Sequence, residues 1–242
     1  MKSRQGFSLI EMAFVLVIVT LLLGGLLVPF TTQVEQKRIA ETQKAMEEIK
    51  EALLGYAVAN GRLPCPVLGP TSGDAPPPPC ANLAGFLPYS TLGVNRADAW
   101  GRLYRYAVST DFTTTFALPT YNISTGACLT SCATITVQTR DSSGVTVALT
   151  SKAVAAVISF GKNGYGGYSA DGDAMKALTN TSPDEDEYTN ATNGSKFFSR
   201  IQMGPRSPCK DGTSNPCEFD DLVTWLSPNV LFNRMVAAGK LP

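Results

Sequence analysis

The sequence contains no histidine among its 242 residues. Histidine is the side chain that titrates closest to neutral pH, so its absence removes the commonest general base and the commonest metal ligand. The chain also lacks a G-K-[ST] phosphate loop and a dinucleotide-binding glycine fingerprint. Lysine plus arginine equals aspartate plus glutamate, at 20 each, which leaves no basic footprint for nucleic acid. We therefore expect a protein that is not an enzyme.

Six cysteines are present, and no two of them form a C-x-x-C motif. Without that motif and without histidine, a structural zinc site is disfavoured, and buried free thiols are the other alternative to disulfides. Sequence alone allows 15 pairings of six cysteines, but the spacing favours three local pairs. Disulfides would place this part of the chain in an oxidising compartment outside the cytoplasm. The expected pairs are Cys65–Cys80, Cys128–Cys132 and Cys209–Cys217.

The N-terminus combines a short basic leader with a long apolar run. Lys2 and Arg4 are the only charges in residues 1–6, and residues 12–30 carry no charge. A run of ~20 apolar residues can cross a bilayer as a helix, with the basic leader on the cytoplasmic side. A cleaved secretory signal would have a shorter apolar region and a small-residue cleavage site. A plain signal anchor would not explain Glu11, because a carboxylate deep in a bilayer costs roughly 2.5–3.5 kcal/mol.

Residues 6–11 read Gly-Phe-Ser-Leu-Ile-Glu and are followed by the apolar run. This segment resembles the cleavage and methylation motif of type IV prepilins and type II secretion pseudopilins. The resemblance implies that a membrane prepilin peptidase cuts between Gly6 and Phe7 and methylates the new α-amine of Phe7. It also implies that Glu11 acts in assembly by pairing with the Phe7 amine of a neighbouring subunit, an amine that is mostly protonated near neutral pH. The alternative is that Glu11 merely lies at the level of the lipid headgroups.

Residues 34–59 have the periodicity of an amphipathic helix, with Ile39, Met46 and Leu53 at intervals of seven. The Asn60-Gly61 pair predicts where this helix ends.

The remainder of the chain alternates predicted strands with loops. Residues 133–138 and 145–149 read as a hairpin, and residues 153–160 read as a central strand because they do not alternate. Together with residues 103–108 these segments predict one antiparallel sheet on which the helix lies. Near the C-terminus, residues 222–226 suit another strand, and Ser227-Pro228 marks the start of a short helix.

Residues 98–106 (DAWGRLYRY) look like the D-P-W-G-x-x-Y-x-Y segment of major pseudopilins, with Ala99 in place of the proline. The resemblance implies that this segment begins the sheet. Three arginines, Arg96, Arg102 and Arg105, could cluster here as a nucleic-acid patch, but Asp98 lies among them and argues against that partner.

A glycine-rich loop at residues 161–173 is followed by a group of acids. We expect no cofactor, and a flexible surface loop explains the glycines. The alternative is calcium, because carboxylates are hard oxygen ligands and major pseudopilins hold calcium in a comparable late loop. The spacing is not that of an EF-hand, so none of the acids is assigned as a ligand. The acids concerned are Asp171, Asp173, Asp184, Glu185, Asp186 and Glu187.

These features predict an α+β, pilin-like fold: a long N-terminal hydrophobic helix packed on an antiparallel sheet, rich in loops and cross-linked by disulfides. Four segments follow from the pattern. They are a prepilin leader at residues 1–6, a transmembrane or filament-core helix segment at 7–30, an amphipathic continuation at 31–61, and a globular periplasmic or extracellular domain at 62–242.

The expected function is that of a structural subunit, a minor pilin or pseudopilin, of a type IV pilus or a type II secretion pseudopilus. The alternative is a membrane-anchored binding module such as a tip adhesin or a DNA-uptake pilin. Expected partners are other pilin or pseudopilin subunits, prepilin peptidase, the inner-membrane assembly platform and membrane lipid. The chain would cross the bacterial inner membrane once, with its domain in the periplasm, and become part of an extracellular filament after assembly. The sequence leaves pilus and pseudopilus open.

Overall fold

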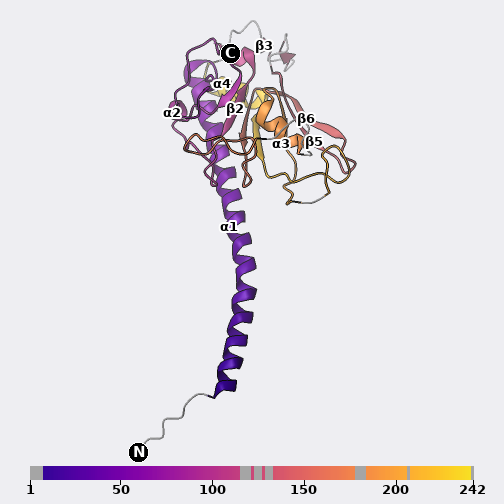
Figure 1. The fold of residues 1–242 in the computed structure, drawn as a ribbon. Helices are drawn as coiled ribbons and strands as arrows, with labels where there is room; N and C mark the ends of the chain where they lie inside the picture. Colours follow the sequence, from indigo (N-terminus) through magenta and orange to yellow (C-terminus); the bar gives the residue numbers. More distant parts are fainter. Residues whose placement is uncertain are drawn as a thin grey trace, which may run out of the picture. The chain divides into compact units, whose positions relative to one another are not determined.

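The computed structural model describes residues 8–114, 121–122, 127–128, 133–177, 184–205 and 208–240, with the backbone alone at residues 22–30, 121–122 and 127–128. The chain divides into two compact units, Met1–Ala40 and Glu41–Pro242. Helix α1 (Leu9–Asn60) begins in the first unit and ends in the second. Figure 1 shows the elements along the chain. The two units are described separately below.

The second unit holds every other helix and strand of the described residues, and these elements are mostly short. In chain order they are β1 (Ala84–Phe86), α2 (Tyr89–Leu92), β2 (Arg105–Val108), the 3-10 helix η1 (Thr110–Phe112), β3 (Tyr121–Asn122), β4 (Ala127–Cys128), β5 (Ile135–Arg140), β6 (Thr146–Ala153), β7 (Ala155–Ser159), α3 (Glu185–Thr192), β8 (Lys196–Phe198), β9 (Leu222–Leu226) and α4 (Pro228–Ala237).

Four strands form an antiparallel sheet in the order β1-β2-β7-β9. Three more form a second sheet in the order β6-β5-β8, in which β5 and β8 run parallel. Strands β3 and β4 pair only with each other. The fold is therefore α+β, with α1 packed on an antiparallel sheet in the second unit.

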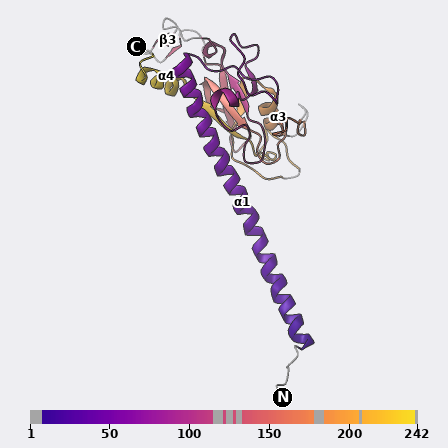
Figure 2. The same cartoon turned by 90° about the vertical axis from the view of Figure 1, so that its left-hand side faces the viewer.

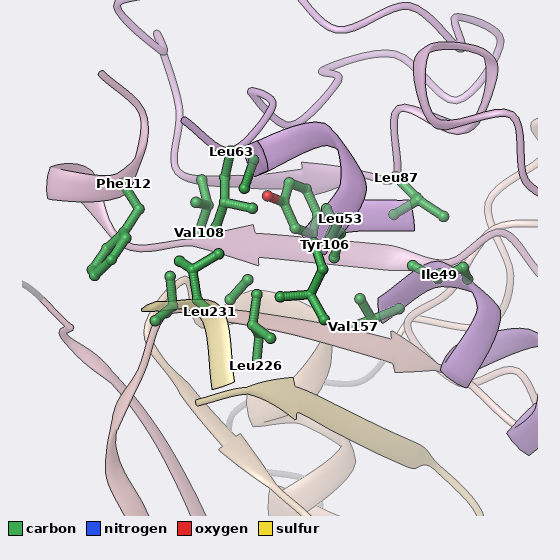
Figure 3. Packing of buried hydrophobic residues seen from close by; sticks show 14 of the residues in the cluster. Ile49, Leu53, Leu63, Leu87, Tyr106, Val108, Phe112, Val157, Leu226 and Leu231 are labelled. Atoms are coloured by element: carbon green, nitrogen blue, oxygen red, sulfur yellow. The ribbon is translucent and has the colours of Figure 1, made fainter. Parts of the chain in front are cut away.

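The central strands of the four-stranded sheet, β2 and β7, are packed on both faces, and alternate residues of each strand point to opposite sides. On one face Tyr106 and Val157 join a core with the C-terminal part of α1, as Figure 3 shows. On the other face Ala156 and Ile158 join a second core with β5, β6 and β8. Every residue of β7 is buried. The prediction of a central strand at this position is confirmed, and its lack of alternation follows from burial on both sides.

The C-terminal part of α1 contributes the stripe that its periodicity predicts. Met46, Ile49 and Leu53 are at most 3% exposed and lie in the first core. Burial of each such side chain contributes roughly 1.5–3 kcal/mol. The helix ends where the sequence predicts: Gly61 has φ +66°, and its N–H donates to the carbonyl of Ala57 at 2.8 Å.

Helix α4 closes the same core and lies beside the C-terminal end of α1 (Figure 2). Leu231 and Met235 are buried in the core, and Arg234 forms an ion pair with Glu51 at 2.8 Å. The pair is exposed and contributes little to stability, so the apolar contacts fix the position of α4. The predicted start of this helix at Ser227-Pro228 is confirmed.

The prediction that residues 133–149 belong to the same sheet as residues 103–108 and 153–160 is wrong. The hairpin forms, as β5 and β6, but it lies in the second sheet and pairs there with β8. The chain passes from one sheet to the other at Val154, between β6 and β7, where the Val154 N–H donates to the Leu226 carbonyl. Side-chain alternation identifies a strand but does not specify its partner, which is why the sequence did not separate the two sheets.

Two disulfides cross-link the loops of the second unit. Cys65 is bonded to Cys80, and Cys209 is bonded to Cys217, which are two of the three local pairs expected from spacing. The third expected pair, Cys128–Cys132, lies outside the residues whose side chains are described.

Candidate functional site

The N-terminal processing residues Gly6 and Phe7 lie outside the described residues. The first described residue, Ser8, is the N-cap of α1, and its carbonyl accepts the N–H groups of Glu11 and Met12 at 3.0 and 3.1 Å. The Glu11 carboxylate in turn accepts the backbone N–H of Ser8 at 3.4 Å. This Ser-x-x-Glu arrangement contains the glutamate half of a capping box, and that side-chain hydrogen bond is long and therefore weak. The pattern was readable in the sequence, and the sequence analysis missed it.

Glu11 is exposed in the first turn of α1. Its position near the helix N-terminus is favourable for an anion by ~0.3–1 kcal/mol. The capping hydrogen bond occupies one carboxylate oxygen, Oε2, on the side facing its own helix. The carboxylate is thus accessible to a cation from another molecule.

The start of α1 exposes large apolar side chains on every side. Leu9, Leu16 and Leu21 are 91%, 63% and 71% exposed, and the apolar residues between them are exposed to a similar degree. A helix that is apolar all round is normally covered by protein or by lipid. Over the residues whose side chains are described, no helix is both long enough and apolar enough to cross a membrane.

A protein-family model matches the N-terminal segment, which contains Glu11 and the first exposed apolar turns of α1. Residues 1–27 match the prokaryotic N-terminal methylation motif, which is consistent with the type IV prepilin and pseudopilin family. Proteins with this motif are structural subunits rather than enzymes, and the motif implies processing by prepilin peptidase and assembly with other pilin subunits. No curated protein and no solved structure is significantly similar to the chain. The family match therefore concerns the N-terminal segment, and the globular domain has to be understood from its own residues.

The segment that resembles major pseudopilins is organised around Asp98, which is 8% exposed. Asp98 Oδ1 accepts the N–H groups of Trp100 and Arg102 at 2.9 and 2.8 Å, and Oδ2 accepts the hydroxyl of Ser159 at 2.6 Å. Burial raises the pKa of Asp98, and these hydrogen bonds partly offset that shift. The carboxylate thereby fixes the turn before β2 against the end of β7.

The three arginines considered for nucleic-acid binding hold loops instead. Each donates to a backbone carbonyl in a different part of the second unit. The pairs are Arg96 with Pro70 (3.1 Å), Arg102 with Lys162 (3.4 Å) and Arg105 with Asn193 (3.1 Å).

The acids considered for calcium do not converge on one point. Asp171 and Asp173 are exposed in the glycine-rich loop. Asp184 lies near the sulfur atoms of Cys209 and Cys217, but these are bonded to each other and cannot act as thiolate ligands.

Asp186 belongs to a buried ion-pair network. Its carboxylate accepts the Nε and Nη2 groups of Arg140 at 2.6–2.9 Å and lies 3.1 Å from Arg200. Arg200 also pairs with Asp211 at 2.9 Å. Burial raises the pKa of Asp186, whereas the Arg140 hydrogen bond lowers it. Two arginines thus pair with two buried aspartates and with the exposed Glu185, which lies 3.6 Å from Arg140, and this network holds the fold together.

Glu187 lies beside two other carboxylates, those of Asp220 and Asp221, and the sequence analysis did not identify this group. Carboxylate oxygens of Glu187, Asp220 and Asp221 lie within 4.8 Å of one another. Glu187 is fully buried, and Asp221 is 2% exposed. Burial, reinforced by the charge of Asp220, raises the pKa of Glu187 to about 8. Burial and then the charge of Glu187 also raise the pKa of Asp221. The three residues form an acidic cluster between the start of α3 and the start of β9.

Proposed function

We propose that this chain is a minor pilin or pseudopilin. Prepilin peptidase removes residues 1–6 and methylates the Phe7 amine, and the mature chain is inserted into a type IV pilus or type II secretion pseudopilus. The match of residues 1–27 to the N-terminal methylation motif is the observation that supports this proposal most strongly. Residues 7–30 form the membrane and filament-core segment. The apolar side chains exposed from Leu9 to Leu21 contact lipid before assembly and neighbouring subunits after it.

Glu11 supplies the specific contact of that assembly. Its exposed carboxylate pairs with the Phe7 amine of the neighbouring subunit. An ammonium group left unpaired in an apolar environment costs roughly 2.5–3.5 kcal/mol, so the pairing selects a register between subunits.

The second unit is the domain that the filament displays. The packing of the C-terminal part of α1 on a four-stranded antiparallel sheet supports a pilin-like arrangement of this domain. The disulfides Cys65–Cys80 and Cys209–Cys217 support its location outside the cytoplasm, in the periplasm and then on the filament. The inner-membrane assembly platform is the remaining partner, because it must extract the chain from the membrane.

The test compares full-length variants in cells that have prepilin peptidase and an assembly system. Gly6→Val places a branched side chain at the cleavage site, and we expect it to retain the leader and remain in the membrane fraction. Gly69→Val is the matched control, because nothing lies within 4 Å of a Cβ added there. It should be processed and recovered with sheared filaments, like the wild type. Recovery of Gly6→Val in filaments at wild-type levels contradicts the proposal, as does wild-type protein that never leaves the membrane fraction.

A further inference from the structure

A pocket of about 360 Å³ lies beside the second core of the second unit. One side of it is formed by the four-stranded sheet, where Phe86 of β1 is paired with Arg105 of β2, and Arg105 with Ile158 of β7. Directly paired residues point to the same face of a sheet, and Ile158 belongs to the second core. Phe86 and Arg105 therefore face the same side of the sheet as that core.

The glycine-rich loop and the C-terminal end of α3 form other walls of the pocket. Gly166 and Tyr168 of the loop line it together with Ala191 of α3. A Cβ added to Gly166 would overlap the Cβ of Ala191, so the loop lies against α3 only because residue 166 has no side chain. Backbone hydrogen bonds hold the loop in place, such as that from the Leu103 N–H to the Tyr168 carbonyl at 2.9 Å. The pocket is thus formed without a ligand, as small-molecule sites usually are.

Aromatic and aliphatic side chains make up most of the lining. The rings of Phe86 and Tyr168 are in edge-to-face contact, with centroids 5.0 Å apart. Phe160 is 3% exposed and adds a third ring, whereas Leu68 is 59% exposed and therefore lies at the opening. Rings of this kind offer a large contact area to an apolar ligand.

Arg105 is the only charged side chain among the described residues that line the pocket. Its Nη2 donates to the carbonyl of Asn193, the C-cap of α3, at 3.1 Å. Its Nε is buried without a hydrogen-bond partner, and no carboxylate of the described residues forms an ion pair with it. Burial lowers the pKa of Arg105, yet a guanidinium stays charged near neutral pH. The C-terminal end of α3 offers only partial negative charge, so the arginine lacks a full counter-charge.

We propose that this pocket binds a small organic carboxylate with an apolar body. The carboxylate pairs with Arg105 through Nη1, which no described residue occupies, and the apolar body packs against Phe86 and Tyr168. One guanidinium balances one negative charge, which favours a carboxylate over a phosphate group of charge about −1.5 to −2. Small-molecule sites measure about 300–1,000 Å³, and a pocket at the lower end of this range favours a small molecule over a protein segment.

The inference goes beyond filament assembly and does not depend on it. Every described residue that lines the pocket lies in the second unit, and none belongs to α1. The full-length unassembled chain, purified in detergent, is therefore suitable for the test.

The experiment is isothermal titration calorimetry with phenylpropionate, phenylbutyrate and octanoate as probes, at neutral pH. Titration of each probe into detergent alone gives the background from its partition into micelles. At least one probe should bind saturably, with one site per chain. The primary amide of that probe keeps the apolar body and lacks the charge, and it should bind roughly 10- to 100-fold more weakly.

Arginine variants test the ion pair. Arg105→Gln removes the charge and should weaken binding of the carboxylate by roughly 10- to 100-fold, without weakening that of the amide. Arg105→Lys keeps the charge without the planar fork and should have an intermediate affinity. Arg234→Gln is the matched control, because Arg234 lies on α4 and is ion-paired with Glu51, and it should bind like the wild type.

A second pair of variants serves if Arg105→Gln does not fold, as judged by circular dichroism. Leu68 is exposed at the opening, so its replacement leaves the fold intact. Leu68→Glu and Leu68→Gln have nearly the same shape and differ in charge. The glutamate should repel the carboxylate and weaken its binding by roughly two- to fivefold relative to the glutamine.

Three results would overturn the proposal. They are no saturable binding of any probe by the wild type, equal affinity for the carboxylate and its amide, and wild-type affinity of folded Arg105→Gln or equal affinity of the two Leu68 variants. In the first case Arg105 serves only to hold the end of α3. None of these results bears on leader processing, so the pocket and the filament function can fail independently.

Discussion

The proposed assembly role of Glu11 can be separated from its role in capping its own helix. In the single chain the Glu11 carboxylate accepts the backbone N–H of Ser8 at 3.4 Å, which is the glutamate half of a capping box. Replacing Glu11 by alanine removes this weak bond and the favourable dipole contact, at a cost of about 0.5–1 kcal/mol in local helix stability. Replacing it by glutamine keeps an acceptor at a position where capping boxes use glutamine, and removes only the charge.

The two roles predict different outcomes in a filament. If the carboxylate pairs with the Phe7 amine of the next subunit, both variants leave that amine unpaired at a cost of roughly 2.5–3.5 kcal/mol. Since 1.4 kcal/mol is a factor of ten, incorporation should fall by roughly 10²-fold for alanine and glutamine alike. If capping alone matters, the glutamine variant should assemble like the wild type.

The assay is quantitative immunoblotting of sheared filaments against the membrane fraction, with leader removal checked in both. Both variants should be processed, since Glu11 lies beyond the cleavage junction. Wild-type incorporation of Glu11→Gln would refute the charge pairing, and wild-type incorporation of Glu11→Ala would also refute a requirement for capping.

The stability of the second unit gives further predictions, each measured by chemical or thermal unfolding. Asp98→Ala removes the acceptor of three hydrogen bonds and should cost about 2–4 kcal/mol, whereas Asp98→Asn should cost less than half of that. Because burial raises the pKa of Asp98 above 3.8, the part of its stability that is linked to a bound proton is complete below pH 3.8 and is lost as the pH rises through the folded-state pKa. Asp98→Asn should remove this pH dependence. Leu53→Ala should cost about 2–5 kcal/mol, and the exposed Val147→Ala should change stability by no more than about 0.5 kcal/mol. Replacing Cys65 and Cys80 together by serine should cost about 3 kcal/mol, because the loop between them is no longer closed in the unfolded chain.

Much of the fold was predictable because local sequence determines it. The end of α1 requires a residue that adopts a positive φ, and Gly61 follows the last periodic residues. The burial of β7 on both faces is visible in its run of apolar residues, and α4 begins at the proline that the sequence marks as its start.

The rest of the fold could not be predicted from local sequence, because it depends on contacts between segments that are far apart in the chain. Strand β8 has only three residues, and its partner β5 lies some sixty residues earlier, so its pairing has no local signal. Helix α3 is polar and rich in acids. It is held by tertiary contacts such as the buried amide of Asn190, which bonds both Phe198 and Asp221. The acidic cluster likewise joins residues more than thirty positions apart. An Asp-Asp pair directly before a strand was its one visible signal in the sequence.

The central claim is that prepilin peptidase processes this chain at one bond. The most direct measurement is mass spectrometry of the N-terminal peptide from wild-type protein produced together with the peptidase. The account predicts that the mature chain begins at Phe7, with its α-amine methylated. A chain that retains Met1 and its leader, or one that is cut at another bond, would contradict the account.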